Sequence, residues 1–183
     1  MSYASRAGAK LEYALQEFRI DPKHFICADF GCSTGGFTDC LLQHGAEKVY
    51  AIDTAYGILD WKLRNDLRVV VMERTNALHI NLEEKIDLIT IDVSWTKQKI
   101  IIPHALTQLK KDGKIISLIK PHYEAPKKYL HNGKLEEEYV EIIVKDIRDI
   151  LSEIVLVKKI IESPLRGEKG KNREFFLFAE LQN

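Results

Sequence analysis

DFGCSTGGF (residues 29–37) is the stretch that decides the fold, because it begins at the end of a short apolar run and opens an amphipathic one. Its glycines let the backbone turn tightly and approach a ligand without a Cβ clash. The expected helix behind them offers unpaired backbone amides. The glycine spacing is GxxxGG, which is neither the GxGxxG of dinucleotide-binding folds nor the GxxxxGK[ST] of phosphate loops. Asp29, at the strand end, would repel a pyrophosphate, so the loop suits a ligand with a positive amino group, such as the methionine part of S-adenosylmethionine.

The rest of the chain alternates short apolar runs with amphipathic stretches, which is typical of a doubly wound α/β domain with a mostly parallel sheet. Two closing runs have no helix between them, so we expect a hairpin that makes the last strand antiparallel. The expected strands are 26–30, 49–53, 69–73, 87–93, 114–120, 153–160 and 174–181, and the expected helices are 7–18, 37–44, 57–65, 99–110 and 135–151, the last with Tyr139, Ile142, Ile143, Ile147 and Ile150 inward. With no repeat or linker, residues 1–183 are predicted to form one domain.

Composition excludes several classes of protein. The 27 basic and 27 acidic residues cancel, which argues against a uniformly basic nucleic-acid coat, although residues 95–183 carry 17 basic and 13 acidic groups. The three cysteines lack paired CxxC spacing, so neither a disulfide framework nor a zinc site is indicated, and the histidines show no metal-ligand spacing. No secretory signal and no apolar run near roughly 18 residues is present. We therefore expect a cytoplasmic protein without a metal or membrane contact.

A second carboxylate supports the idea of a bound nucleoside. Asp53 ends the second expected strand, 24 residues after Asp29. This is where a carboxylate accepts hydrogen bonds from the ribose hydroxyls of an adenosine. A tight turn without a ligand is the alternative, and the three glycines with two placed carboxylates favour S-adenosylmethionine over it.

Four further charged residues fall where solvated charges are not expected. Asp92 and Lys120 end two parallel strands, Lys10 begins the first helix, and Glu174 opens the last strand. Ligands of open α/β sheets bind beyond the carboxyl ends of the strands, and an antiparallel last strand would start at that same edge. We therefore expect the four to form one site, although each alone is equally consistent with a surface charge. Since burial and neighbouring cations favour a neutral amine, a lysine here can act as a general base.

Several long motifs resemble one family. The segments SRAGAKL (5–11), DFGCSTGGFTD (29–39), VYAIDTAYGILDWKLR (49–64), VVVMERTNA (69–77), IDVSW (91–95) and IKPHYEA (119–125) are similar to the methyltransferase domain of TlyA-type (hemolysin A) proteins, within the FtsJ-like ribosomal RNA 2′-O-methyltransferases. The resemblance covers nearly the whole chain. It implies a Rossmann-like S-adenosylmethionine-dependent methyltransferase fold, with ribosomal RNA or a ribosomal subunit as the partner. Family members normally carry an N-terminal S4 RNA-binding domain, and the resemblance implies that this chain starts at or just after the linker to it.

The resemblance also implies roles for individual residues. The family's Lys-Asp-Lys-Glu tetrad falls on Lys10, Asp92, Lys120 and Glu174, with Lys120 taken to deprotonate the ribose hydroxyl. Here Lys171 separates Gly170 from Asn172, where the family pattern has them adjoining. The family's cofactor pocket maps onto Asp29, Gly31, Ser33, Gly35, Asp53, Asn76 and Asp92.

RNA contacts require cations near the active edge. On the expected loops of this edge lie Arg6, Lys97, Lys99, Lys127, Lys128, Arg166, Lys169, Lys171 and Arg173. Trp95 occupies the place of a family phenylalanine; it either stacks on a base or completes the core, and we expect the core position.

The leading hypothesis is therefore S-adenosylmethionine-dependent methylation of a ribose 2′-hydroxyl in ribosomal RNA. One alternative is methyl transfer to a small molecule or protein. Another is a non-catalytic RNA-binding or ribosome-assembly factor on the same fold, against which the intact Lys10, Asp92 and Lys120 argue. Membrane lysis, suggested by the family's name, is disfavoured because no strongly amphipathic basic helix is expected.

Overall fold

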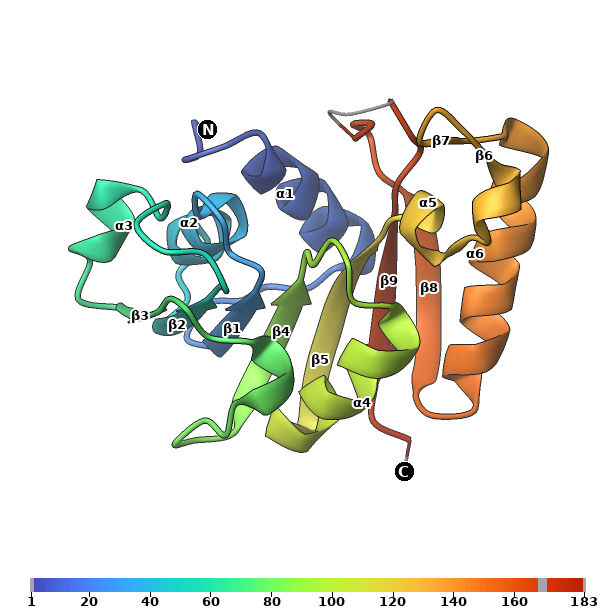
Figure 1. Cartoon of the computed structure of the whole chain (residues 1–183). Helices are drawn as coiled ribbons and strands as arrows, with labels where there is room; N and C mark the ends of the chain where they lie inside the picture. Colours follow the sequence, from blue (N-terminus) through green and yellow to red (C-terminus); the bar gives the residue numbers. More distant parts are fainter. Residues whose placement is uncertain (1, 168–170, 183) are drawn as a thin grey trace.

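A seven-stranded sheet with helices on both faces forms the protein in the computed structural model, which describes residues 2–167 and 171–182 (Figure 1). The strands are ordered β3-β2-β1-β4-β5-β9-β8, and all pairs are parallel except the two that β9 makes with β5 and β8. The elements are α1 Ala7–Phe18, β1 Ile26–Phe30, α2 Gly36–Gln43, β2 Lys48–Ile52, α3 Trp61–Arg64, β3 Val69–Met72, η1 Ala77–His79, β4 Ile86–Ile91, α4 Gln98–Gln108, β5 Leu109–Ile119, α5 Pro121–Glu124, η2 Lys127–Tyr129, β6 Leu130–His131, β7 Lys134–Leu135, α6 Glu137–Ser152, β8 Leu156–Glu162 and β9 Phe175–Glu180. The predicted fold class, with its antiparallel last strand, is confirmed.

Two apolar layers hold the helices on the sheet. Alternate residues of the strands point to opposite faces, so Cys27 packs with α1 and α2, whereas Ala28 and Phe30 pack with α4 and α6. The central strands β1, β4 and β5 are buried on both faces, which explains their continuous apolar sequence. Strand β3 lies at the sheet edge and is only partly buried.

Three local expectations need correction. The helix expected over 57–65 is limited to α3, because Gly57 adopts a left-handed backbone and Asp60 caps the helix only from that point. In α6 the buried face carries Val140, Ile143, Val144, Ile147 and Leu151, while Ile142 and Ile150 are exposed. The buried face is therefore rotated relative to the predicted one, toward Val140 and Val144 and away from Ile142 and Ile150.

Strand β5 begins five residues earlier than expected. Its pairing with β4 moves from Ile86↔Leu109 to Leu88↔Lys114, so residues 110–113 bulge opposite the single residue Asp87. Residues 109–110, expected at the end of a helix, and residues 111–113, expected in a turn, therefore belong to an irregular strand. A Cβ on Gly113 would meet the Ile86 carbonyl oxygen at 2.9 Å, which makes this position suited to glycine.

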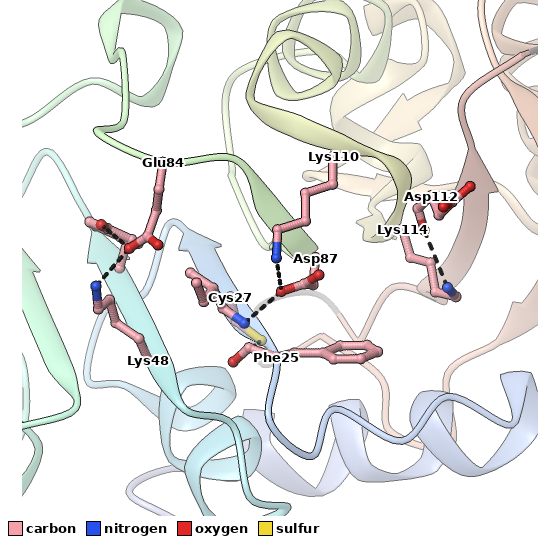
Figure 2. A network of polar contacts seen from close by, with 10 residues as sticks. Phe25, Cys27, Lys48, Glu84, Asp87, Lys110, Asp112 and Lys114 are labelled. Atoms are coloured by element: carbon pink, nitrogen blue, oxygen red, sulfur yellow. Dashed lines mark hydrogen bonds and ion pairs between the residues drawn. The ribbon is translucent and has the colours of Figure 1, made fainter.

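Polar contacts close the amino end of the parallel strands (Figure 2). Asp87 accepts hydrogen bonds from the backbone of Ile26 at 2.9 Å and from Lys110 Nζ at 2.8 Å, and Lys48 Nζ donates to Glu84 at 2.6 Å. These bonds satisfy groups at the starts of β1, β2, β4 and β5. They leave the opposite, carboxyl edge open for a ligand.

Candidate functional site

Two cavities open at the carboxyl edge of the sheet, where the strand order reverses between β1 and β4. This reversal point is where open α/β sheets bind ligands. Cavity 1, of about 470 Å³, lies toward α1, and cavity 2, of about 400 Å³, lies toward β2 and β3. They share Gly31, Ser33 and Asp92 in their linings, so one extended ligand can reach from one cavity into the other.

The glycine loop separates and lines the two cavities. Gly31 has φ +85°, and a Cβ built on it would lie 2.7 Å from the Asp92 carbonyl oxygen, so any side chain here strains the loop. Gly35 has φ +95° and precedes α2, where a Cβ would collide with Leu63. Unlike Gly31 and Ser33, Gly35 lines neither cavity, so its effect on a ligand is through the shape of the loop.

Asp53 and Asn76, which are predicted to bind adenosine, both line cavity 2. Asp53 Oδ2 accepts a hydrogen bond from the Ser33 backbone at 2.8 Å and Oδ1 accepts one from Ala55 at 2.8 Å. Since a carboxylate has about four acceptor positions, two remain for hydroxyl groups. Asn76 Oδ1 caps η1 by accepting from Leu78 N at 3.0 Å.

Asp29 is predicted to contact the ligand, but the structure places its side chain away from both cavities. Its side chain is fully buried, lines neither cavity, and accepts hydrogen bonds from Thr38 Oγ1 at 2.7 Å and Thr90 Oγ1 at 3.1 Å. Burial raises the pKa of Asp29 to about 7, against the opposing effect of these two hydroxyl donors. The carboxyl group therefore links β1, β4 and α2 beneath the glycine loop. The residue type of Asp29 does not reveal these two partners, Thr38 and Thr90, whose hydroxyl groups hold the carboxylate in the interior.

Lys10 and Glu174 form a buried ion pair in cavity 1. Lys10 Nζ lies 2.6 Å from Glu174 Oε2, and their side chains are 8% and 4% exposed. Residues 10 and 174 meet because α1 packs beside the start of the antiparallel strand β9, as the sequence predicts. Lys171 adopts a left-handed backbone with φ 51°, and Glu174 reaches Lys10 with this additional residue in the chain.

Lys120 and Asp92 form a second ion pair in the same cavity. Lys120 Nζ lies 2.5 Å from Asp92 Oδ1, with side chains 14% and 21% exposed. Thus all four tetrad residues line cavity 1, and Asp92 also lines cavity 2. Cys32 lines cavity 1 too, and burial raises the pKa of its thiol, which keeps it protonated at neutral pH.

An aromatic cluster extends from the rim of the site. Trp95 is 86% exposed, so the expected core position is wrong. Its ring contacts Tyr123 at a centroid distance of 5.1 Å, and Tyr123 contacts His122 at 4.3 Å. Burial, with a smaller contribution from the Lys120 charge, lowers the pKa of His122 to about 4, so this ring is neutral at pH 7. The cluster presents an uncharged aromatic platform, of which Trp95 lines cavity 2.

The cations expected to contact RNA divide into two groups. Lys97, Lys99, Lys127, Lys128, Arg166, Lys171 and Arg6 are exposed, and Arg6 also lines cavity 1 and donates to the Arg166 carbonyl at 2.8 Å. Arg173 does not belong with them: its guanidinium binds Glu137, Glu141 and Glu162 at 2.7–2.9 Å. These carboxylates raise its pKa and occupy the donors that a phosphate would need. Lys169 lies outside the described residues.

Within residues 2–167 and 171–182, no group of three or more acidic, His or Cys side chains is arranged to hold a metal ion. No helix in this part of the chain combines the length and apolar character needed to cross a bilayer.

Comparison with known proteins gives consistent matches over nearly the whole chain. The sequence model of the FtsJ-like methyltransferases matches residues 3–181. YqxC of Bacillus subtilis, whose name places it among rRNA methyltransferases, is 39% identical over 184 residues, covering 97% of this chain and 65% of its own length. The 16S/23S rRNA (cytidine-2′-O)-methyltransferase TlyA of Mycobacterium tuberculosis is 37% identical over 190 residues, covering 99% of this chain and 69% of its own.

A solved structure from Streptococcus thermophilus, which carries the name hemolysin, superimposes with a TM-score of 0.94 at 35% identity. The match covers 100% of this chain and 68% of that one. The chain therefore spans about two thirds of the length of these relatives.

Proposed function

This chain belongs to the FtsJ-like methyltransferase family, and we propose that it transfers a methyl group from S-adenosylmethionine to a ribose 2′-hydroxyl of ribosomal RNA. The observation that carries the proposal is the gathering of Lys10, Asp92, Lys120 and Glu174 in one cavity beside the glycine loop. Ribosomal RNA is named in the YqxC and TlyA relatives, which supports it as the acceptor.

The residues around cavity 2 fit the nucleoside part of S-adenosylmethionine. Asp53 has acceptor positions left for two ribose hydroxyls, and Gly31 lets the loop that lines the cavity pass close to the Asp92 carbonyl, where a Cβ would clash. Ser33, Gly31 and Asp92 line both cavities, so the methionine part would continue past them into cavity 1. When bound, this cofactor supplies an electrophilic methyl group on a sulfonium centre.

Lys120 is proposed as the general base. Its amine, in the deprotonated form, would accept the proton of the 2′-hydroxyl as the oxygen attacks the methyl group. Asp92 Oδ1, at 2.5 Å, holds the Lys120 Nζ in place and stabilises the ammonium that forms. Because a sulfonium methyl is already reactive, most of the rate enhancement would come from positioning.

Lys10 and Glu174 are proposed to orient the ribose. The ion pair fixes the Lys10 ammonium on the wall of cavity 1, which residues of the glycine loop also line. Its donors would hydrogen-bond the acceptor nucleotide, while Glu174 prevents the ammonium from turning away. Arg6 and the exposed lysines on η2 would contact flanking phosphates, and Trp95 would stack on an unpaired base.

The test is transfer of labelled methyl groups from S-adenosylmethionine to ribosomal RNA and to isolated ribosomal subunits. Nuclease digestion then locates the label on a base or a ribose. Label on a ribose supports the proposal. Label on a base, or on protein or a small molecule instead of RNA, would assign a different acceptor. Cofactor binding without transfer to any of these acceptors would favour a non-catalytic assembly factor.

A further inference from the structure

The geometry points to Asn172 as a positioning residue that holds Glu174 against Lys10 and connects this pair to the β6–β7 hairpin. The inference rests on the proposed function, because it concerns how the same cavity is kept ready for its acceptor. Asn172 belongs to the sequence pattern that precedes Glu174, and its role here is argued from its contacts in the fold.

Asn172 is buried and its side-chain amide is used at both ends. Its exposed fraction is 4%. Its Oδ1 accepts a hydrogen bond from Leu135 N at 2.9 Å, and its Nδ2 donates to the Gly133 carbonyl at 3.2 Å. Both partners are backbone groups of the β6–β7 hairpin, 37 and 39 residues away along the chain. A side chain without this paired donor and acceptor would leave buried backbone groups unsatisfied.

The backbone of Asn172 shapes the wall behind Glu174. The Asn172 carbonyl accepts a hydrogen bond from Gly167 N at 3.0 Å. A Cβ on Gly167 would lie 2.7 Å from Glu174 Oε1, so the glycine is in close contact with that oxygen. The other carboxylate oxygen, Oε2, contacts Lys10 Nζ at 2.6 Å. Glu174 is therefore confined between Gly167 and Lys10, and the Asn172 carbonyl holds one of these two neighbours, Gly167.

The hairpin at the other end of this connection is largely exposed and carries Lys134, with Lys128 before it and Glu136 after it. Its turn is fixed by two residues with left-handed backbones, Asn132 with φ 49° and Gly133 with φ 77°. Lys128, His131 and Lys134 are exposed on or beside it. A phosphate bound at these side chains would contact the element that Asn172 holds. Asn172 thus links a surface that suits an RNA backbone to the ion pair inside the cavity.

Arg173, between the two residues, has a different role. It binds carboxylates of α6 and β8 whose side chains are 41–68% exposed, at a place where ion pairs contribute little to stability individually. Its side-chain hydrogen bonds go to Glu137, Glu141 and Glu162 and not to the hairpin. Arg173 anchors β9 to its neighbours, whereas the Asn172 side chain binds the hairpin and its backbone carbonyl binds Gly167, which lies against Glu174.

The experiment compares Asn172→Ala with Gln108→Ala, each alone and combined with Glu174→Gln, in methyl transfer to ribosomal RNA. Gln108 is the matched control, because it is also buried and its Oε1 accepts a backbone hydrogen bond, from Leu82 at 2.9 Å, far from the site. We expect Asn172→Ala to lower kcat about tenfold or more, with KM for S-adenosylmethionine changed less than twofold. In the Glu174→Gln background it should cause no further loss, since coupled residues are not additive. Equal fold-losses in both backgrounds, or a loss matched by Gln108→Ala, would overturn the inference.

A second readout does not depend on activity. Acylation of Lys10 by a water-soluble amine reagent is followed by mass spectrometry of the peptide that contains it. We expect slow labelling in the wild type and Gln108→Ala, and at least about tenfold faster labelling in Asn172→Ala. If the wild type methylates no RNA, the proposed function fails, and this labelling alone decides the positioning role. Equal labelling rates in the three proteins would refute it.

Discussion

The buried ion pair between Lys10 and Glu174 makes a quantitative prediction about stability. The two charged atoms lie 2.6 Å apart, with side chains 8% and 4% exposed. Glu174→Ala would leave the Lys10 ammonium buried without its partner. Removal of one member of a buried pair costs about 3–5 kcal/mol. We expect the lower end, about 3 kcal/mol, because cavity 1 gives water access to the ammonium.

Urea denaturation measures this free energy of unfolding. With a denaturant slope of about 2 kcal/mol per molar, the loss corresponds to a midpoint lower by about 1.5 M. The double variant Lys10→Met with Glu174→Leu removes both charges, and we expect it within about 1 kcal/mol of the wild type.

The matched control for this measurement is Glu17→Ala. It breaks the Lys159–Glu17 pair, which has a distance of 3.0 Å and side chains 47% and 42% exposed. This exposed pair should contribute less than about 1 kcal/mol. A cost for Glu174→Ala no larger than that for Glu17→Ala would refute the argument that burial makes the first pair structurally important.

Three further predictions concern the loop, the platform and the buried carboxyl group. Gly31→Ala should lower the free energy of unfolding, measured by thermal denaturation, by at least about 1 kcal/mol more than Gly57→Ala does. Both glycines have positive φ, but only a Cβ on Gly31 would meet a backbone oxygen, at 2.7 Å. Equal losses in the two variants would contradict this. Trp95→Ala should raise KM for RNA about 5- to 100-fold, as loss of base stacking does, and should change the free energy of unfolding by no more than about 0.5 kcal/mol. Trp61, which is also exposed, is the control, and Trp61→Ala should leave KM unchanged. A KM effect shared by both variants would argue against stacking on Trp95. Asp29 has a pKa near 7 in the folded protein and about 3.9 in the unfolded chain. Its contribution to the free energy of unfolding is therefore fully present below about pH 4 and is lost as the pH rises toward 7. The stability of Asp29→Asn relative to the wild type should therefore increase by about 2 kcal/mol between pH 5 and pH 7 in urea denaturation, and parallel pH profiles would show that the buried carboxyl group does not titrate there.

Much of the fold and the tetrad follows from local sequence pattern. The continuous apolar strands predict a parallel sheet, and the two closing strands predict the antiparallel β9. Once those directions are known, Asp92, Lys120 and Glu174 must meet at one edge, because strand ends of a sheet are neighbours. Residues far apart in sequence could therefore be grouped without knowing any contact.

The direction in which a side chain points could not be predicted in the same way. Asp29 precedes the loop as a ligand-binding carboxylate would, but Thr38 and Thr90 draw it into the interior. Arg173 has the sequence context of an RNA contact, and three glutamates from separate elements engage it instead. Both outcomes depend on partners brought close only by the tertiary fold. The prediction that Trp95 lies in the core was wrong for a different reason. A large, apolar side chain suggests the core, but an exposed aromatic ring can be retained for function.

The central claim, that Lys120 acts as the base in ribose methylation, is tested most directly by single-turnover transfer of labelled methyl to ribosomal RNA. Wild type, Lys120→Ala and the control Lys110→Ala are compared at saturating S-adenosylmethionine, with the cofactor Kd measured for each. Lys110 pairs with Asp87 at the opposite edge of the sheet, so its loss should not alter transfer (Figure 2). We predict that Lys120→Ala binds the cofactor with its Kd within about threefold of the wild type and loses ribose methylation by a factor of about 10² or more. Ribose methylation within tenfold of the wild-type rate in Lys120→Ala would contradict the account.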